Sequence, residues 1–387
     1  MFVHPVYPFR VPPTMHFGIG AISRVGEEAR RLGAERVLLI ADAGVARAGV
    51  AERVKQVLSD AGIEVEVYSD IVGEPTLQSV ESCVAIARAD HYDLLIGLGG
   101  GSAMDTAKAC SLLLGNPGPI SEYFGVERVP ARGTPIILIP TTAGTASEVS
   151  PGTIVADTER ELKIGVVSQH LIADVAIVDP ELTYGVPPAV TAATGMDALT
   201  HAIESFLARR STPHTRMYSL ESTRHIGAHL RQAVWNGGDA AARYYMALGS
   251  FLAGFPMVNA GTGLVHAMAY PLGGQFHITH GVANALLLPH VLDFNLPAAV
   301  PQFALLAEAL GEPVAGLSPR AAAEMLVAAV RELSEDVGIP RRLRDLGVPE
   351  AALEGMVPGA LSATRLTENN CRLATTEDCL AIYRQAW

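Results

Sequence analysis

The first half of the chain alternates short apolar runs with stretches of helical spacing. Runs rich in Val, Ile and Leu, bounded by Gly, Pro or Asp, predict strands at 36–40, 64–68, 93–98, 135–139 and 175–178. Between several of them lie predicted helices, such as 45–61 and 76–89. This alternation is typical of βαβ units around a mainly parallel sheet, whose ligands bind at the carboxyl ends of the strands.

The pattern changes after Asp179-Pro180, where Pro187-Pro188 interrupts the chain and an Ala- and Leu-rich region follows. Apolar positions at helical spacing predict helices at 190–208, 215–233, 240–252, 281–294, 301–310, 319–337 and 376–387. We therefore expect an α/β domain over 1–184 and an all-α domain over 185–387.

Composition supports a two-domain enzyme and excludes some classes of partner. The chain has 387 residues, of which 49% are hydrophobic and 18% charged, enough to bury two cores. Its net charge is −12 and it has no long basic run, which argues against nucleic acid and anionic membranes. The first residues do not resemble a secretory signal, and no apolar run reaches the roughly 18 residues of a membrane span. We expect a soluble cytoplasmic protein whose four cysteines are free thiols.

Two loops in the first half have the composition of phosphate-binding turns. Gly99-Gly100-Gly101-Ser102 joins a predicted strand to a predicted helix, where backbone N–H groups can approach a pyrophosphate, although such a run can also simply make a tight turn. The segment Pro140 to Glu148 (PTTAGTASE) follows another strand, and its hydroxyls and Gly144 suit a polar ligand or a hydrophilic turn.

The acid that would bind an adenosine ribose is not found at its usual place, about 20 residues after the glycine run. Asp42, which follows the strand at 36–40, is the candidate instead. A carboxylate there would repel a 2′-phosphate and so favour NAD over NADP. Asp42 is equally suited to cap a helix, and the two roles are compatible.

Four residues of the second half could hold a metal ion. Asp197 and His201 are four apart in a helical pattern, so they share one face. His266 lies in another apolar helical stretch, which we expect Pro271 to Gly274 to end, and His280 begins the next helix. Either pair alone could be an ordinary polar contact or a buried histidine. Together, one carboxylate and three imidazoles suit Fe²⁺, Zn²⁺, Co²⁺ or a similar ion.

The chain resembles the iron-containing (group III) alcohol dehydrogenases over nearly its whole length. The resemblance rests on segments that occur in the same order: HFGIGA at 16–21, GGGSAMDTAK at 99–108, PTTAGTASEV at 140–149, GMDALTH at 195–201 and GLVHAMAYPLGGQFHITHGVANALLLPH at 263–290.

This resemblance implies an N-terminal dinucleotide-binding domain, a C-terminal helical metal-binding domain like that of dehydroquinate synthase, and a cleft between them. It implies hydride transfer between a small alcohol and NAD, and a homodimer or higher homo-oligomer. It places the metal at Asp197, His201, His266 and His280. The cofactor contacts that it implies are Asp42, Gly99, Gly100, Gly101, Ser102, Asp105, Thr141, Thr142, Thr145 and Lys163, of which Asp105 and Lys163 come from the resemblance alone.

The chain departs from many relatives at one position. They carry a further histidine four residues after the third metal ligand, where it helps to relay a proton, and this chain has Tyr270. We expect bulk water, Tyr270 or His277 to take that part, with His277 in the substrate pocket. Alternatives for the whole chain are a zinc-dependent polyol dehydrogenase like glycerol dehydrogenase, a hydroxyacid–oxoacid transhydrogenase, or a binding protein that has lost catalysis.

Overall fold

A six-stranded, entirely parallel sheet forms the centre of the N-terminal half. The computed structural model describes residues 6–71, 73, 75–157 and 162–387. The sheet has the strand order β1-β9-β6-β4-β2-β3. Its strands are β1 (Thr14–Phe17), β2 (Arg36–Asp42), β3 (Glu64–Ile71), β4 (Leu94–Gly99), β6 (Ile136–Pro140) and β9 (Val175–Val178). The central strands β4 and β6 are fully buried, which is why they are apolar at every position rather than at alternate ones.

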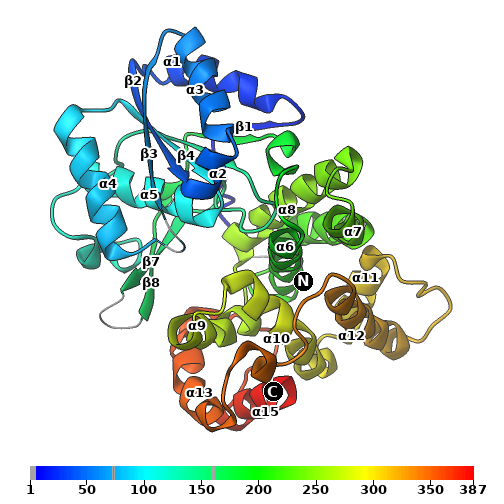
Figure 1. Ribbon diagram of the computed structural model, residues 1–387. Coiled ribbons are helices and arrows are strands. Elements are labelled where there is room, and N and C mark those ends of the chain that lie inside the picture. Colours follow the sequence, from blue (N-terminus) through cyan, green and yellow to red (C-terminus); the bar gives the residue numbers. More distant parts are fainter. Residues whose placement is uncertain (1–5, 72, 74, 158–161) are drawn as a thin grey trace.

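Helices cover both faces of this sheet (Figure 1). One face packs against α1 (Val25–Arg31) and α3 (Val50–Asp60), and the other against α4 (Leu77–Asp90) and α5 (Gly101–Gly115). The prediction of an α/β domain with a mainly parallel sheet is confirmed.

One predicted helix of this half is in fact two. The helix expected at 45–61 is divided into α2 (Ala43–Arg47) and α3, because Gly49 adopts a left-handed conformation with φ of 78° between them. Glycine takes this conformation without the steric cost that a β-carbon brings, so it ends one helix and starts the next.

A small second sheet was not predicted. It contains β5 (Gly125–Val126), β7 (Gly152–Asp157) and β8 (Leu162–Val167), in the order β5-β8-β7, and β7 and β8 run antiparallel. Ile154 is exposed on β7 while the neighbouring Val155 is buried. The hairpin extends from the parallel sheet toward α9 (Leu264–Phe276), which contacts β8 (Figure 1).

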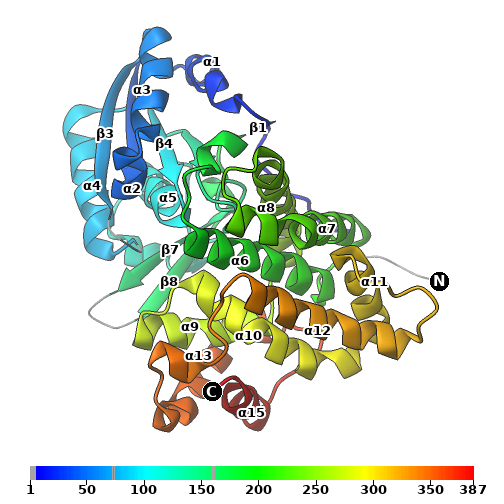
Figure 2. The same ribbon diagram turned by 45° about the vertical axis from the view of Figure 1, so that its right-hand side comes forward.

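The C-terminal half is helical throughout its described residues, as predicted. After the turn at Pro180–Thr183, its longer helices are α6 (Pro188–Leu207), α7 (Pro213–Trp235), α8 (Ala240–Ala260), α9, α10 (His280–Asn295), α11 (Val300–Leu310), α12 (Pro319–Asp336), α13 (Leu353–Ser362) and α15 (Thr376–Ala386), with the short α14 (Thr364–Thr367) between the last two. Figure 2 shows α6 and α10 running through the middle of this half, and their apolar residues belong to one large core. The domain boundary predicted at 184/185 lies between β9 and α6 and stays a prediction.

Two helix ends differ from the prediction, and prolines explain both. α9 does not end at Pro271 to Gly274 but continues to Phe276, and α8 continues beyond Leu252 through Pro256 to Ala260. A proline inside a helix removes one backbone hydrogen bond. Buried residues on both sides of each proline, such as Met268 and Leu272 in α9, are packed in the core and hold the helix together across it.

The two halves are joined by contacts that are distant in sequence. In the N-terminal segment, the backbone of Arg10 exchanges two hydrogen bonds with the side chain of Asn259 on α8. Among the described residues no single helix is long and apolar enough to cross a membrane, whereas α8 and α9, bent by 101° at their junction, pass the same length and composition test as a pair.

Candidate metal and cofactor site

Three of the four predicted metal ligands meet in the interior of the helical half. One side-chain ligand atom from each of Asp197, His201 and His266 lies within 4.8 Å of the others, and all three residues are buried. His280 lies beside them, with Nε2 at 3.9 Å from Oδ1 of Asp197. Asp197 and His201 are one turn apart on α6, and His266 and His280 lie on either side of the junction between α9 and α10. The fold therefore brings together residues that are far apart in sequence.

A neighbouring glutamate orients one of these imidazoles. Glu204 lies on α6, and its carboxylate accepts hydrogen bonds from Nδ1 of His266 at 2.6 Å and from the backbone of Val265 at 2.6 Å and Gly263 at 3.0 Å. Because a carboxylate only accepts, Nδ1 of His266 carries the proton and Nε2 presents a lone pair to the cluster. This arrangement is common around protein metal ions.

The amide of Asn284 shows that the lone pairs converge. Its Nδ2 donates to Oδ1 of Asp197 at 2.7 Å, and it lies 3.2 Å from Nε2 of His266 and 3.0 Å from Nε2 of His280. Three candidate ligand atoms thus lie around one amide nitrogen. The carbonyl oxygen of Asn284 and Nδ1 of His201 are buried and have no hydrogen-bond partner.

The protonation of this cluster suits metal binding. Burial lowers the pKa of His201 to about 4, against the opposing pull of Asp197, so this imidazole is neutral at neutral pH. Burial alone would raise the pKa of Asp197, but the nearby imidazoles and the amide of Asn284 lower it below its ordinary value. A carboxylate beside the neutral imidazole of His201 and the Nε2 lone pair of His266, buried in an apolar core, fits a divalent cation.

A second group of predicted residues lies at the carboxyl ends of β2, β4 and β6, which are neighbours in the sheet. Asp42 caps α2, since its Oδ1 accepts from the backbone N–H of Val45 at 2.9 Å, so the capping role is present. Its Oδ2 faces the glycine run. A β-carbon on Gly99, where φ is +150°, would lie 2.7 Å from that oxygen, so only glycine fits there.

The loop after β6 packs against the glycine run. The backbone N–H of Thr141 donates to the carbonyl of Gly99 at 2.9 Å, and a β-carbon on Gly101 would lie 3.1 Å from Cγ2 of Thr145. Gly101 begins α5, so the positive end of a long helix meets this loop. Thr142 is close by, about 3.7 Å from the position of a β-carbon on Gly100.

Asp105 connects α5 to this loop and to β7. Its Oδ1 accepts from the hydroxyl of Ser147 at 2.6 Å, and its Oδ2 accepts from the backbone of Ile154 at 2.9 Å. The fully buried ammonium of Lys108 donates to the same Ser147 at 2.7 Å and to the carbonyl of Gly152 at 2.8 Å. Both carboxylate oxygens of Asp105 are therefore engaged by the protein itself.

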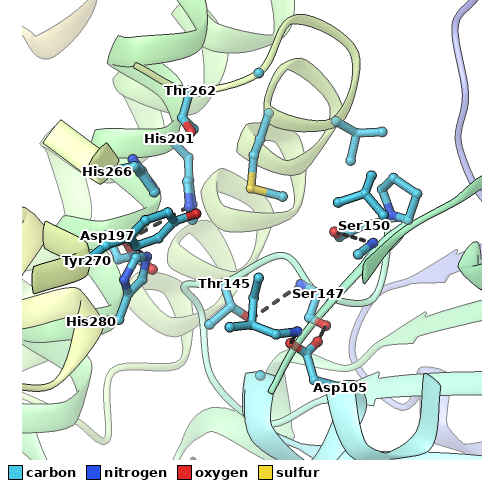
Figure 3. A pocket seen from close by; sticks show the side chains of 18 of the residues that line it. Asp105, Thr145, Ser147, Ser150, Asp197, His201, Thr262, His266, Tyr270 and His280 are labelled. Atoms are coloured by element: carbon cyan, nitrogen blue, oxygen red, sulfur yellow. Dashed lines mark hydrogen bonds and ion pairs between the residues drawn. The ribbon is translucent and has the colours of Figure 1, made fainter. Parts of the chain in front are cut away.

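One cavity of about 310 Å³ connects these two groups of residues. Figure 3 shows Asp197, His201, His266 and His280 on one side of it, and Asp105, Thr145 and Ser147 on the other. Gly101 and Ser102 also line it. The cavity thus places the histidine cluster next to the turn expected to bind the cofactor phosphates.

Comparison with known proteins identifies the family. A model of the iron-containing alcohol dehydrogenases matches residues 12–180, and a model of the C-terminal part of the Fe-containing alcohol dehydrogenase family matches residues 191–387. The chain belongs to the iron-containing alcohol dehydrogenase family. The resemblance inferred from the sequence, and with it the assignment to the alcohol dehydrogenase class of enzymes, is confirmed.

Similar members of this family match almost from end to end. Long-chain-alcohol dehydrogenase 1 of Geobacillus thermodenitrificans is 42% identical over 380 residues, which are 97% of this chain and 95% of that protein. The NAD-dependent methanol dehydrogenase of Bacillus methanolicus is 38% identical, over 98% of this chain and 99% of that one. The crystal structure of a 1,3-propanediol oxidoreductase, 41% identical, superposes with a TM-score of 0.97 and covers 99% of this chain and 100% of its own.

The other predicted site residues of this iron-type dehydrogenase, Tyr270, His277 and Lys163, do not all lie at the cavity. Tyr270 lines the cavity, and burial raises the pKa of its hydroxyl. His277 does not line it: the residue ends α9 in a left-handed conformation with φ of 55° and is exposed. Its place in the substrate pocket stays a prediction. Lys163 belongs to β8, but its side chain is outside the part of the chain that the structure describes.

Three further residues belong to this site and were not predicted from the sequence: Glu204, Asn284 and Arg365. Glu204 follows Asp197 and His201 at helical spacing, and Asn284 follows His280 by one turn, so both signals were present in the sequence. Arg365 lines the cavity from α14, far from any motif, and nothing in the sequence pointed to it.

Proposed function

We propose that this chain is a metal-dependent dehydrogenase that transfers a hydride between a small alcohol and NAD. In the forward direction a primary alcohol and NAD⁺ give an aldehyde, NADH and one proton: the hydride leaves the carbinol carbon and the proton leaves the hydroxyl. The observation that carries the proposal is the single cavity that joins the buried Asp197, His201 and His266 to the turn at Gly101 and Ser102.

The N-terminal residues bind and orient the cofactor. We propose that the pyrophosphate lies against Gly99 to Ser102 at the start of α5, and that Asp42, at the end of β2, accepts hydrogen bonds from the ribose. The proposed contacts also include Thr141, Thr142, Thr145 and Lys163. Asp105 supports this binding by holding the loop of Ser147 in place. The negative charge of Asp42 favours NAD over NADP.

The helical half would hold the ion through Asp197, His201, His266 and His280. A divalent ion in this position supplies a Lewis acid that polarises the substrate oxygen. The family name supports Fe²⁺, and the ligand types also accept Zn²⁺ or another divalent ion. Glu204 fixes the orientation of His266, and the surrounding apolar helices limit the access of water.

Tyr270 is the proposed proton carrier of the cavity. Burial raises the pKa of its hydroxyl, so Oη carries a proton at neutral pH. In aldehyde reduction Oη donates this proton to the oxygen of the substrate and takes another from solvent, and in alcohol oxidation the proton follows the reverse path. The exposed position of His277 favours Tyr270 or bulk water over that histidine. We further propose that the enzyme is cytoplasmic and a homodimer or larger homo-oligomer.

A metal-exchange assay tests this function. The protein is stripped of metal, reloaded separately with Fe²⁺, Zn²⁺, Co²⁺ and Mn²⁺, and assayed with alcohols and NAD⁺ or aldehydes and NADH. We expect no turnover of the stripped protein, recovery with at least one ion, and a preference for NADH over NADPH. Activity that persists without metal, or that is absent with every ion and substrate, would contradict the proposal.

Two related reactions are separated by the same assay. Turnover of a hydroxy acid with an oxo acid in the absence of added NAD would indicate a transhydrogenase, and selective oxidation of glycerol with zinc would indicate a polyol dehydrogenase.

A further inference from the structure

A cationic side chain that has no ion-pair partner among the described residues lines the cavity. Arg365 on α14 lines the same cavity as Asp197, His266 and Tyr270, and its side chain is exposed. In the described part of the chain Arg365 makes no ion pair with a carboxylate, and it lines the cavity together with Tyr270, whose pKa its positive charge lowers against the effect of burial. The positive charge is therefore not neutralised by this part of the protein.

The segment that carries Arg365 is fixed to the metal-binding helices. The side-chain amide of Asn369 donates at 2.9 Å to the carbonyls of both Ala260 and Thr262, in the turn between α8 and α9. Asn370 exchanges hydrogen bonds with Asn295 at the end of α10. Both asparagines are buried, so α14 has a defined position beside the cavity.

The pair formed by Arg365 and Tyr270 has donors to spare. A guanidinium group has N–H donors and no acceptor, so toward the hydroxyl of Tyr270 Arg365 can only donate. The other N–H groups of Arg365 are then left to donate, while the O–H of Tyr270 serves the reacting oxygen. Donors grouped around a positive charge at a cavity wall match a ligand with anionic oxygens.

The acidic groups nearby are already committed. Asp105 accepts hydrogen bonds from Ser147 and Ile154 within the protein, and Glu204 accepts from His266, Val265 and Gly263. Asp197 belongs to the proposed metal ligands. Each of these carboxylates already has partners of its own. The anionic group that pairs with Arg365 would therefore come from the substrate.

We propose that Arg365 binds an anionic group of the substrate, and that this enzyme prefers short aldehydes and alcohols that carry a carboxylate or sulfonate at the end away from the reacting carbon. This inference rests on the proposed hydride transfer, because it assigns the opposite end of the substrate of that reaction. Tyr270 acts as the positioning partner of the guanidinium.

The test compares matched substrates on matched variants. Kinetics with NADH are measured for succinic semialdehyde, for a sulfonate analogue of the same chain length, and for the neutral amide of succinic semialdehyde. In the wild type we expect kcat/KM to be higher for the anions than for the amide. In Arg365→Gln this ratio should fall by about tenfold or more, mainly through KM, since a hydrogen bond to a charged group is lost. Arg365→Lys should restore part of it.

Controls separate this inference from other roles of Arg365. Arg320→Gln, on the exposed face of α12, should leave the ratio unchanged. The Kd of NADH, measured by fluorescence, should be the same in Arg365→Gln and the wild type. A changed Kd with an unchanged substrate ratio would mean that the arginine binds the cofactor, and would overturn the inference.

A binding assay keeps the test independent of turnover. Butyrate and ethanesulfonate should raise the melting temperature of the NADH complex of the wild type and not that of Arg365→Gln, because a ligand stabilises only the state that binds it. If neither anion stabilises the wild type, the anion site does not exist. If the amide is reduced as well as the anions are, the proposed function stands and this inference fails; if no substrate is turned over, the proposed function itself fails.

Discussion

At the scale of single residues, the most informative side chain is one that would not touch the metal. Glu204 fixes the proton of His266 on Nδ1, so that Nε2 can serve as a ligand. In Glu204→Gln one of the two carboxylate oxygens becomes an N–H₂ group, which cannot accept from His266 or the backbone. We expect the affinity for the divalent ion to fall by roughly 10–100-fold, as for other groups that orient metal-binding histidines.

Competition with a chromophoric chelator measures this affinity. Glu221→Gln, an exposed acid on α7, is the matched control and should bind metal like the wild type. Equal affinities of Glu204→Gln and the control for the divalent ion would show that Glu204 has only a structural role.

A second residue gives the stability of the protein a dependence on pH. Burial raises the pKa of Glu148 to about 7, against the opposing effect of Lys108, from an ordinary value of 4.5. As pH rises from 4.5 to about 7, the unfolded chain releases this proton before the folded chain does. The free energy of unfolding therefore falls over this pH range. Glu148→Gln remains neutral, and the gain in melting temperature over the wild type should grow from about pH 5 to about pH 8.

The metal-free form of both proteins should be used for this series, so that proton release from the metal ligands does not enter. Glu324→Gln, which is exposed on α12, should give a difference that does not change with pH. If the difference in melting temperature between Glu148→Gln and the wild type narrows as pH rises, Glu148 is ionised in the folded protein.

At the scale of elements, the turn from β4 into α5 has the strictest requirement. A β-carbon at Gly99 would lie 2.7 Å from Oδ2 of Asp42 and 2.9 Å from Cβ of Ala103. Gly99→Ala should therefore weaken NADH binding by at least about tenfold and cost about 1–3 kcal/mol of stability. Gly238→Ala, where a side chain has open space and no left-handed conformation, is the control for fluorescence titration and melting. Unimpaired NADH binding in Gly99→Ala would place the cofactor elsewhere.

Elements could be predicted from sequence where local signals decide them. The buried strands β4 and β6 are continuous apolar runs, and α4 begins directly after Thr76, whose side chain forms a capping box with Ser79. The positions of α8 and α9 could not be predicted in full, because prolines that usually end helices are held there by packing against distant residues. The hairpin of β7 and β8 was missed although its two strands are neighbours in the sequence and pair with each other.

Some residues of the candidate site could likewise be predicted from the sequence, and others could not. The metal-ligand candidates have helical spacing and a clear chemistry, so their sequence pattern pointed to one location. Arg365 reaches the cavity only because Asn369 and Asn370 fix α14 against other helices, and such a contact leaves no periodic signal. The position of His277 depends on where α9 ends, and the sequence predicted that end too early.

At the scale of the whole molecule, the arrangement of the two halves is what makes a reaction possible. The parallel sheet presents the carboxyl ends of β2, β4 and β6, and the helical half presents Asp197 and three imidazoles across the cavity. Hydride transfer needs both sides at once. The metal should also add to the stability of the helical half, since its candidate ligands come from α6, α9 and α10.

Titration of the metal-free protein with Co²⁺ tests the central claim most directly, because its visible spectrum reports the ligands of the bound ion. We predict one equivalent bound per chain, with the spectrum of mixed nitrogen and oxygen ligation, and loss of this binding in both Asp197→Ala and His266→Ala. The NADH affinity of those variants should remain, which would show that they are folded. Binding of Co²⁺ that survives both substitutions, or no binding to the wild type, would contradict the proposed metal site and the function built on it.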